Sequence, residues 1–174
     1  SKPKTIYSRS KKKSEQYWER IDVPDEIKRI KSMDEWLEMP REFREKHSSY
    51  IEQEFQRRKN GFWFMNNGDP TYITGRHYMT LQWSKFDVGY PNYLEFQRRI
   101  FLHFAACEAD DRCIGQMYVK CRRSGYTNMS SAILLDEGTQ VKDKLLGIQS
   151  KTGKDAQENI FMKKVVFMHR SYPF

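Results

Sequence analysis

The chain contains the segment Gln116-Met-Tyr-Val-Lys-Cys-Arg-Arg-Ser-Gly-Tyr-Thr-Asn-Met-Ser-Ser-Ala-Ile-Leu-Leu135. Its first residues form an apolar run that is typical of a buried strand, and its last residues are typical of a helix. A short basic loop joins the two parts. Strand, loop and helix in this order predict a phosphate-binding loop, in which free backbone amides at the start of the helix hold phosphate oxygens.

The loop departs from the common phosphate-binding pattern G-x-x-x-x-G-K-[ST]. Gly125 occupies the position of the second glycine, and Thr127 occupies the hydroxyl position that holds Mg²⁺ in this pattern. Tyr126 stands where the lysine is expected, whereas Lys120 stands where the first glycine is expected. Because the lysine stem is long and flexible, Lys120 can still reach the same phosphates from the mouth of the loop.

Three further residues complete the predicted loop. Arg122 and Arg123 carry fork-shaped donors that suit phosphate oxygens, and Ser124 directly precedes the glycine. A simpler interpretation exists, because a strand, a basic turn and a helix occur in many α/β proteins. In that case both arginines are solvated surface charges, and the motif alone does not separate the two interpretations.

The rest of the chain predicts a helical N-terminal part, then a β-hairpin, then alternating helices and strands. Gly61 after a long helix is typical of a C-cap, and Asn67-Gly68 is a strong hairpin turn signal. The expected elements are helical fragments over 14–38, a helix over 40–60, a hairpin over 61–74, a helix over 91–110, a strand over 114–119, a helix over 124–135, a strand over 145–150 and a helix over 154–169. The alternation at the end predicts a parallel α/β sheet with right-handed crossovers.

Two of these segments resemble parts of a known family. The segment Val119-Lys-Cys-Arg-Arg-Ser-Gly-Tyr-Thr-Asn-Met129 resembles the deviant Walker A loop of large terminase subunits, the DNA-packaging motors of tailed bacteriophages. The segment Tyr72-Ile-Thr-Gly-Arg-His-Tyr-Met-Thr-Leu-Gln-Trp83 is similar to a Tyr-Ile-x-Gly-x-His-Tyr segment of such subunits, particularly those of crAss-like and related phages.

Two more segments follow the same family order. Pro91-Asn-Tyr-Leu-Glu-Phe-Gln-Arg-Arg-Ile100 resembles the adenine-reading Q motif, with Phe96 and Gln97 in the aromatic and glutamine positions. Leu146-Gly-Ile-Gln-Ser-Lys-Thr-Gly-Lys-Asp-Ala156 is similar to the strand, turn and helix that come next. The resemblance therefore covers about residues 60–174 in the family's order, and this order is more specific than any single motif.

The resemblance implies the N-terminal part of a P-loop NTPase with a RecA-like parallel sheet. It divides the chain into a basic flexible arm over 1–13, a helical region over 14–60 and the start of the ATPase domain over 61–174. It implies that Mg-ATP is bound, with Lys120 on the phosphates, Thr127 as the Mg²⁺ ligand, and Gln97 with Phe96 on adenine. The full set of implied binding residues is Lys120, Arg122, Arg123, Ser124, Gly125, Tyr126, Thr127, Gln97 and Phe96.

The resemblance also implies partners and a location. A large terminase subunit couples ATP hydrolysis to the movement of double-stranded DNA into a procapsid. It works as a homo-oligomeric ring together with a portal protein and a small terminase subunit. We therefore expect the chain to act in the cytoplasm of a phage-infected bacterium, and not in a membrane.

One expected part of the family's ATPase is missing from the sequence. A Walker B segment is an apolar strand that ends in Asp and then Glu, and neither Asp110-Asp111 nor Asp136-Glu137 fits it. No nuclease-type acidic cluster is visible either. We therefore expect this chain to be the N-terminal part of a larger motor, with no catalytic residue of its own and no independent ATPase activity.

Composition is consistent with a folded, basic, intracellular protein. The hydrophobic share of 38% provides enough apolar material for a core, and no secretory signal or apolar run of membrane-spanning length is present. Residues 1–13 carry six basic and no acidic side chains, out of a net charge of +8. This arm either binds a phosphate backbone or is a solvated terminus.

Two other function classes stay open. The first is a non-catalytic nucleic-acid-binding module that uses the basic arm and exposed aromatic side chains. The second is another P-loop NTPase, such as a helicase.

The histidine and cysteine residues do not indicate a metal site. His77 lies in an aromatic neighbourhood, so we expect a packed, hydrogen-bonded residue. Cys107, Cys113 and Cys121 lack paired C-x-x-C spacing, which argues against zinc and favours small, partly buried thiols. Cys121 lies within the loop and becomes reactive if its basic neighbours lower its pKa.

Overall fold

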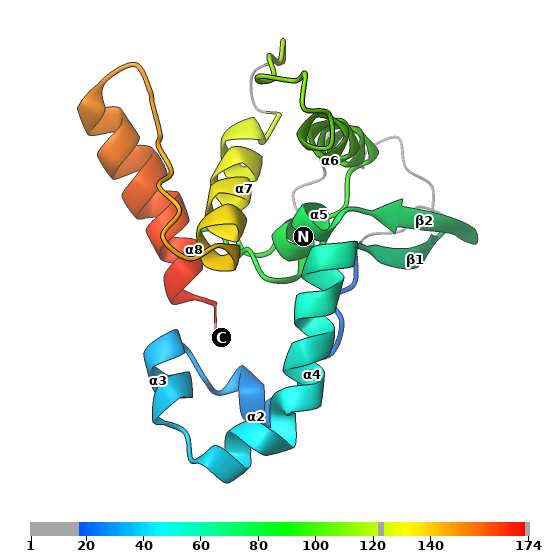
Figure 1. The fold of residues 1–174 in the computed structure, drawn as a ribbon, viewed down its shortest axis with the longest axis vertical. Helices are drawn as coiled ribbons and strands as arrows, with labels where there is room; N and C mark the ends of the chain where they lie inside the picture. The colour runs from blue at the N-terminus through cyan, green and yellow to red at the C-terminus, as the bar shows by residue number, and fades with distance from the viewer. Residues whose placement is uncertain (1–17, 122–123, 173–174) are drawn as a thin grey trace.

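The computed structural model of the chain describes residues 18–121 and 124–172. This part of the protein is mostly helical, with a single two-stranded antiparallel hairpin (Figure 1). The predicted arm over 1–13 lies outside the described residues. The elements are α2 (Asp25–Lys28), α3 (Met33–Glu38), α4 (Arg41–Asn60), β1 (Phe62–Asn66), β2 (Asp69–Ile73), α5 (Gly75–Gln82), α6 (Glu95–Glu108), α7 (Tyr126–Gln140), the π-helix η1 (Asp155–Val166) and α8 (Phe167–Arg170).

The predicted RecA-like parallel sheet is wrong. Residues 114–119 and 145–150 have no regular secondary structure and pair with no strand in the described part of the chain. Leu146 and Ile148 face α7. Their neighbour Leu145 points to solvent and is 97% exposed. The alternation of apolar side chains is therefore present, but these side chains cover a helix instead of completing a sheet.

The segment 114–119 shows the same behaviour against α6. The Tyr118 hydroxyl donates to the Ile100 carbonyl at 3.4 Å, and its ring meets the His103 ring edge-on at 6.2 Å. Met117 and Val119, which alternate with Gln116 and Tyr118, are exposed, and so is Ile114 at the start of the segment. An apolar run in the sequence is typical of a buried strand, but it does not establish that a neighbouring strand exists.

The long helix and the hairpin after it agree with the prediction. Helix α4 ends at Asn60, and the C-cap residue Gly61 has a φ of 82°, a positive value that glycine adopts readily. The hairpin turn has φ of 56° at Asn67 and 89° at Gly68, so both central residues have the positive φ that a type I′ turn requires. Asn66 then pairs with Asp69 across the turn.

Helix α5, which the sequence pattern does not predict, is the most buried helix among the described residues. Every residue from His77 to Gln82 is buried. Its first residue, Gly75, packs so closely against the end of α4 that an added Cβ would lie 1.7 Å from the Arg58 carbonyl oxygen. Only glycine permits this approach, and it brings α5 into contact with both α4 and α7.

A buried ion pair joins α4 to α7. Arg58 is 3% exposed and Asp136 is fully buried, and Arg58 Nη2 lies 2.8 Å from Asp136 Oδ1. Arg58 also donates to the Tyr172 hydroxyl and to Thr139 Oγ1, each at 2.8 Å. Arg58 belongs to the basic last turn of α4, but its side chain enters the core instead of facing solvent.

Besides Asp136, a second acidic side chain is buried: Glu54, one helical turn before Arg58 on α4. Glu54 is fully buried and accepts hydrogen bonds from the Tyr78 hydroxyl at 2.7 Å and from Trp83 Nε1 at 2.8 Å. Arg57 forms an ion pair with its other oxygen. Burial, followed by the charge of Glu54, raises the pKa of Tyr78, so its hydroxyl remains a neutral donor. All of these donors are needed, because a buried carboxylate is costly unless it is paired.

His77 is packed as predicted but is not hydrogen-bonded as predicted. Its ring stacks on Phe101 at 4.6 Å and on Tyr93 at 5.8 Å between centroids. Neither ring nitrogen has a hydrogen-bond partner among the described residues. Burial, together with the nearby charge of Arg98, lowers the pKa of His77 to about 3. The imidazole is therefore neutral at physiological pH.

We expect Arg58→Ala to lower the free energy of unfolding by about 3–5 kcal/mol, because it leaves the Asp136 carboxylate buried and unpaired. Urea unfolding of both proteins measures this difference. Arg41→Ala is the matched control, since the Arg41–Glu45 pair is exposed and should contribute at most about 1 kcal/mol. Equal losses in the two variants would contradict the structural role of the buried pair.

We also expect His77 to make the fold sensitive to acid. In the unfolded chain the imidazole takes up a proton near its ordinary pKa of 6.5, but in the fold it does so only near 3. Stability is therefore lost as the pH falls from about 6.5 toward 3, by up to about 1.4 kcal/mol per pH unit. His77→Phe keeps the aromatic stack and should lose less stability over this range. Identical pH profiles of unfolding would contradict the assignment.

Candidate functional site

The helix α7 begins with an open N-terminus. Gly125 is its N-cap residue with φ of 77°, and no side chain of the described residues caps it. The Gly125 carbonyl accepts from the amides of Asn128 at 3.0 Å and Met129 at 3.1 Å, so the helix is regular from its first turn. The amides before them are the ones that a helix leaves without intrahelical partners, and the helix dipole makes this end attractive to anions.

Gln97 lies directly beside this N-terminus. An added Cβ at Gly125 would be 3.3 Å from Gln97 Nε2, although the two residues belong to different helices. Gln97 is 8% exposed and Phe96, the preceding residue of α6, is half-buried. The structure therefore brings together Gly125 and Gln97, two residues that the sequence predicts for the same site.

The other residues of the loop differ in their surroundings. Tyr126 is half-buried, with its ring 5.3 Å from that of Tyr118, and burial raises the pKa of its hydroxyl. Ser124 Oγ is buried and has no hydrogen-bond partner in the described part of the chain. Thr127 is exposed, and its carbonyl accepts from Ser131 Oγ at 2.7 Å.

The structure describes only one of the three cationic residues that the sequence predicts for the loop. Lys120 is exposed on the segment that leads into the loop, so its ammonium group is free to move. Arg122 and Arg123 lie outside the described residues. The sequence does not predict Lys164, which reaches from η1 and donates to Asn128 Oδ1 at 2.6 Å in the first turn of α7. No local signal reveals this lysine, because only the packing of η1 against α7 brings it to the site.

The acidic residues near α7 do not form a metal site. Among residues 18–121 and 124–172, no group of three or more His, Cys, Asp or Glu side chains could hold a metal ion. Asp136 is occupied by Arg58, and Glu137 pairs with Arg76 and Lys144. A Mg²⁺ ion at Thr127 would therefore need the phosphate oxygens of a nucleotide and water as its other ligands.

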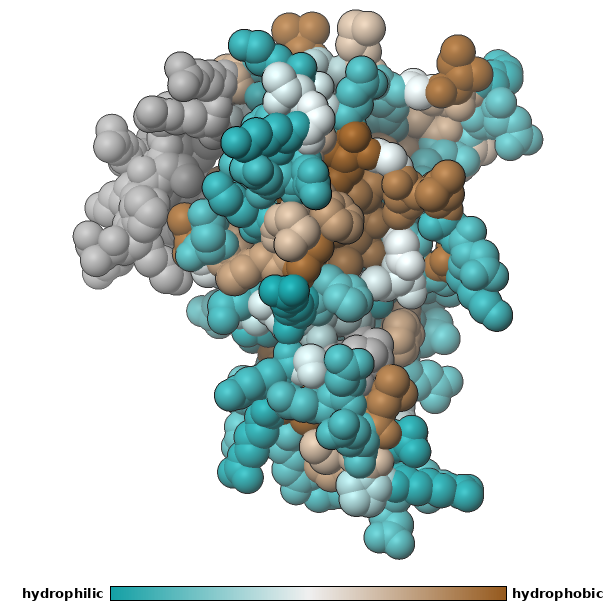
Figure 2. Space-filling view, turned by 90° about the vertical axis from the view of Figure 1, so that its left-hand side faces the viewer, coloured by the Kyte–Doolittle hydropathy of each residue, from teal (hydrophilic) through white to brown (hydrophobic). Residues whose placement is uncertain are grey.

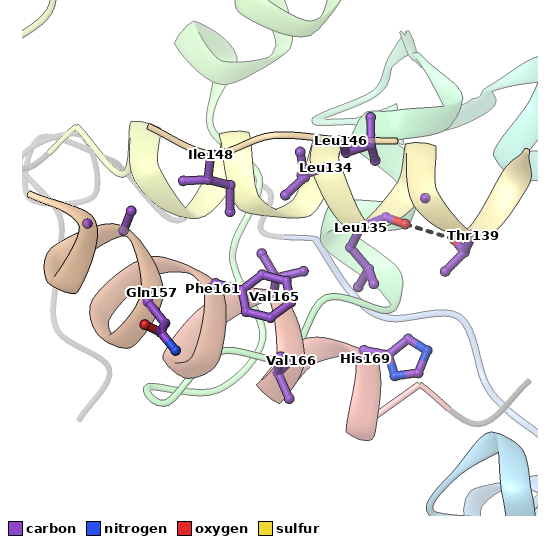
Figure 3. A pocket seen from close by; sticks show the side chains of 13 residues that line it. Leu134, Leu135, Thr139, Leu146, Ile148, Gln157, Phe161, Val165, Val166 and His169 are labelled. Carbon is purple, nitrogen blue, oxygen red and sulfur yellow. Dashed lines mark hydrogen bonds between the residues drawn. The ribbon is translucent and has the colours of Figure 1, made fainter. Parts of the chain in front are cut away.

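A cavity of about 650 Å³ lies away from this loop, between α7 and η1. Figure 2 faces the side on which η1 lies and shows apolar side chains gathered in its upper half. Figure 3 shows Leu134, Ile148 and Phe161 lining the cavity from three separate segments. The lining contains no Lys or Arg, so the cavity does not suit a triphosphate. The complete lining is Leu134, Leu135, Gly138, Thr139, Leu146, Ile148, Gly153, Ala156, Gln157, Phe161, Val165, Val166 and His169.

Comparison with known proteins adds no relative. No protein-family model, no curated protein and no solved structure matches the chain. Among the described residues, no helix combines the length and the apolar composition that crossing a membrane requires. The candidate site therefore depends on the geometry around Gly125 alone.

We expect Gly125→Ala to destabilise the protein by about 1–2 kcal/mol, because an L-residue is strained at this positive φ. Gly138→Ala is the matched control, since its added Cβ also meets a flexible side chain at 3.3 Å but sits inside α7. There alanine favours the helix, so the control should be neutral or stabilising. Thermal unfolding compares the two variants. Equal effects would show that the conformation of Gly125 is not what the loop requires.

Proposed function

We propose that the chain binds Mg-ATP at the N-terminus of α7 and is part of a DNA-packaging motor, the large terminase subunit of a tailed phage. The observation that carries this proposal is the contact between Gly125 and Gln97, with Gly125 in the left-handed conformation at an uncapped helix start. A phosphate group fits the helix amides there, and the Gln97 amide has both a donor and an acceptor for the edge of adenine.

The remaining loop residues supply charge and hydroxyl groups for the same ligand. Lys120 is exposed on the entering segment and can swing toward a phosphate, since its stem has four flexible carbons. Ser124 Oγ lacks a protein partner among the described residues, and a change of its side-chain rotamer would be needed to expose it to a phosphate oxygen. Lys164 adds a cation beside the first turn of α7. These groups position and neutralise phosphates, which is the main task of a protein in phosphoryl transfer.

The proposal extends to the assembly in which the chain acts. In a packaging motor, ATP hydrolysis in a homo-oligomeric ring moves double-stranded DNA through a portal protein, with a small terminase subunit as a further partner. This takes place in the cytoplasm of the infected bacterium. The acidic residues for hydrolysis would come from outside this chain, since Asp136 and Glu137 are engaged in ion pairs.

Calorimetric titration with Mg-ADP and Mg-ATPγS tests the proposal. We expect Lys120→Ala to weaken binding by roughly tenfold or more, because a charge-assisted hydrogen bond to phosphate contributes about 1.5–3 kcal/mol. The control is Lys142→Ala, which removes another exposed lysine, beyond the opposite end of α7. We expect this variant to bind like the wild type.

Two other outcomes would contradict the proposal. Equal nucleotide affinity in the wild type and Lys120→Ala would show that Lys120 does not bind the nucleotide. Failure of the folded wild type to bind either nucleotide would reject the site. Steeply salt-dependent DNA binding that survives Lys120→Ala would then favour the nucleic-acid-binding module.

A further inference from the structure

The apolar cavity between α7 and η1 has the size of a small-molecule site. Its volume is about 650 Å³, within the range of about 300–1,000 Å³ that is usual for ligand pockets, and such pockets often lie between packed helices. An apolar cavity of about 150 Å³ is already large enough to bind benzene. The cavity therefore has room for a ligand several times larger than one aromatic ring.

Three separate segments of the chain line this cavity (Figure 3). Leu135 of α7 and Val165 of η1 form its most buried part, since they are only 4% and 8% exposed. Phe161 of η1 is 44% exposed and lies nearer the opening, and Ile148 adds a third wall from the segment that follows α7. A ligand can therefore insert between two helices instead of lying flat on one helix face.

Small residues keep the space between the helices empty. Gly138 lies inside α7, where glycine is a poor helix former, and a Cβ at this position would already be 3.3 Å from Leu146 Cδ1. Gly153 and Ala156 line the other side of the cavity, just before and within η1. The cavity therefore has a definite cause in the sequence, because larger side chains at these positions would fill it.

One wall of the cavity is a helix of a rare type. The 12 residues of η1 form a π-helix, and no other π-helix occurs in the described part of the chain. Such helices are usually only one turn long and are frequently found at functional sites. The least common backbone geometry of this protein therefore lies directly beside the cavity.

The lining of the cavity determines the charge of its ligand. Lys, Arg, Asp and Glu make up 31% of the chain, yet none of the 13 lining residues is of these types. An ion in the cavity would lose its hydration without gaining a carboxylate, ammonium or guanidinium partner, which is costly. The lining therefore suits an uncharged, mainly apolar molecule.

The cavity also offers a polar contact at its edge. Figure 3 shows the Gln157 amide at one end of the lining and the His169 ring at the other. Thr139 is already engaged, because its hydroxyl donates to the Leu135 carbonyl at 2.9 Å and accepts from Arg58. The Gln157 amide has no hydrogen-bond partner in the described part of the chain, and it provides both a donor and an acceptor.

We propose that the cavity is a binding site for an uncharged, elongated, mainly apolar small molecule with one terminal hydrogen-bonding group, such as a long-chain alcohol. The apolar body of the ligand contacts Leu135, Phe161 and Val165, and its polar end bonds to the Gln157 amide. This site is separate from the helix start at Gly125, so it does not depend on nucleotide binding there.

Fluorescence titration with prodan, an uncharged naphthyl ketone whose emission shifts to the blue in apolar surroundings, tests the proposal. We expect the wild type to bind prodan saturably and 1-decanol to displace it. Ala156→Phe fills the cavity and should abolish this binding. The matched control is Asn159→Phe, which adds the same ring to an exposed position of η1 outside the lining and should bind like the wild type.

A second variant tests the polar contact by itself. Gln157→Leu keeps a side chain of similar size but removes the amide, so we expect prodan to bind about three- to tenfold more weakly through the loss of one neutral hydrogen bond. Unchanged affinity in this variant would overturn the role assigned to Gln157.

Hydrogen–deuterium exchange of the wild type with 1-decanol locates the ligand without any substitution. Protection should appear in peptides that cover 145–153 and 155–169, and not in α4. The proposal would be overturned if the folded wild type bound no prodan, if folded Ala156→Phe bound it undiminished, or if protection appeared elsewhere. A concentration-dependent dimer that excludes prodan would also overturn it, because a second copy would then occupy the cavity.

Discussion

The buried ion pair between Arg58 and Asp136 is the constraint on which the arrangement of helices depends. It fixes the end of α4 against the middle of α7. Arg58 also donates a hydrogen bond to Tyr172, which attaches the last described residues to the same two helices. Removing two charges from water is costly, and the cost is offset only when geometry and additional hydrogen bonds are good. The helices that carry these groups can therefore shift little relative to one another.

Helix α5 fills the space that this ion pair leaves between α4 and α7. Gly75 allows its start to touch the Arg58 carbonyl, while Tyr78 and Trp83 donate hydrogen bonds to the buried Glu54. The hairpin and α6 then pack around α5, and His77 stacks on Phe101 of α6. Since α7 is held by this core, the position of Gly125 beside Gln97 is a consequence of packing rather than of the loop sequence alone.

Local signals in the sequence predict local structure well and non-local structure poorly. The Asn67-Gly68 turn and the helix end at Gly61 follow from backbone preferences of single residues, so they can be predicted without the fold. The strand prediction over 114–119 is wrong, because a short apolar run does not show whether a neighbouring strand exists. The buried role of Arg58 is equally hidden, since its partner is distant in the chain.

The candidate site likewise contains some residues that the sequence predicts and others that it does not. Gly125 and Gln97 can be predicted from motif order, whereas the approach of Lys164 to Asn128 depends on the packing of η1 and has no sequence signal. Function is therefore best tested where separate helices meet, at the start of α7.

Hydrogen–deuterium exchange with and without Mg-ATPγS tests the central claim most directly, because it locates a ligand on the backbone. The nucleotide should slow exchange in peptides that contain Ser124 to Met129 and Gln97, and leave residues 145–150 beside the apolar cavity unchanged. Unchanged exchange at the start of α7 under saturating nucleotide, or protection only around the cavity, would contradict the claim.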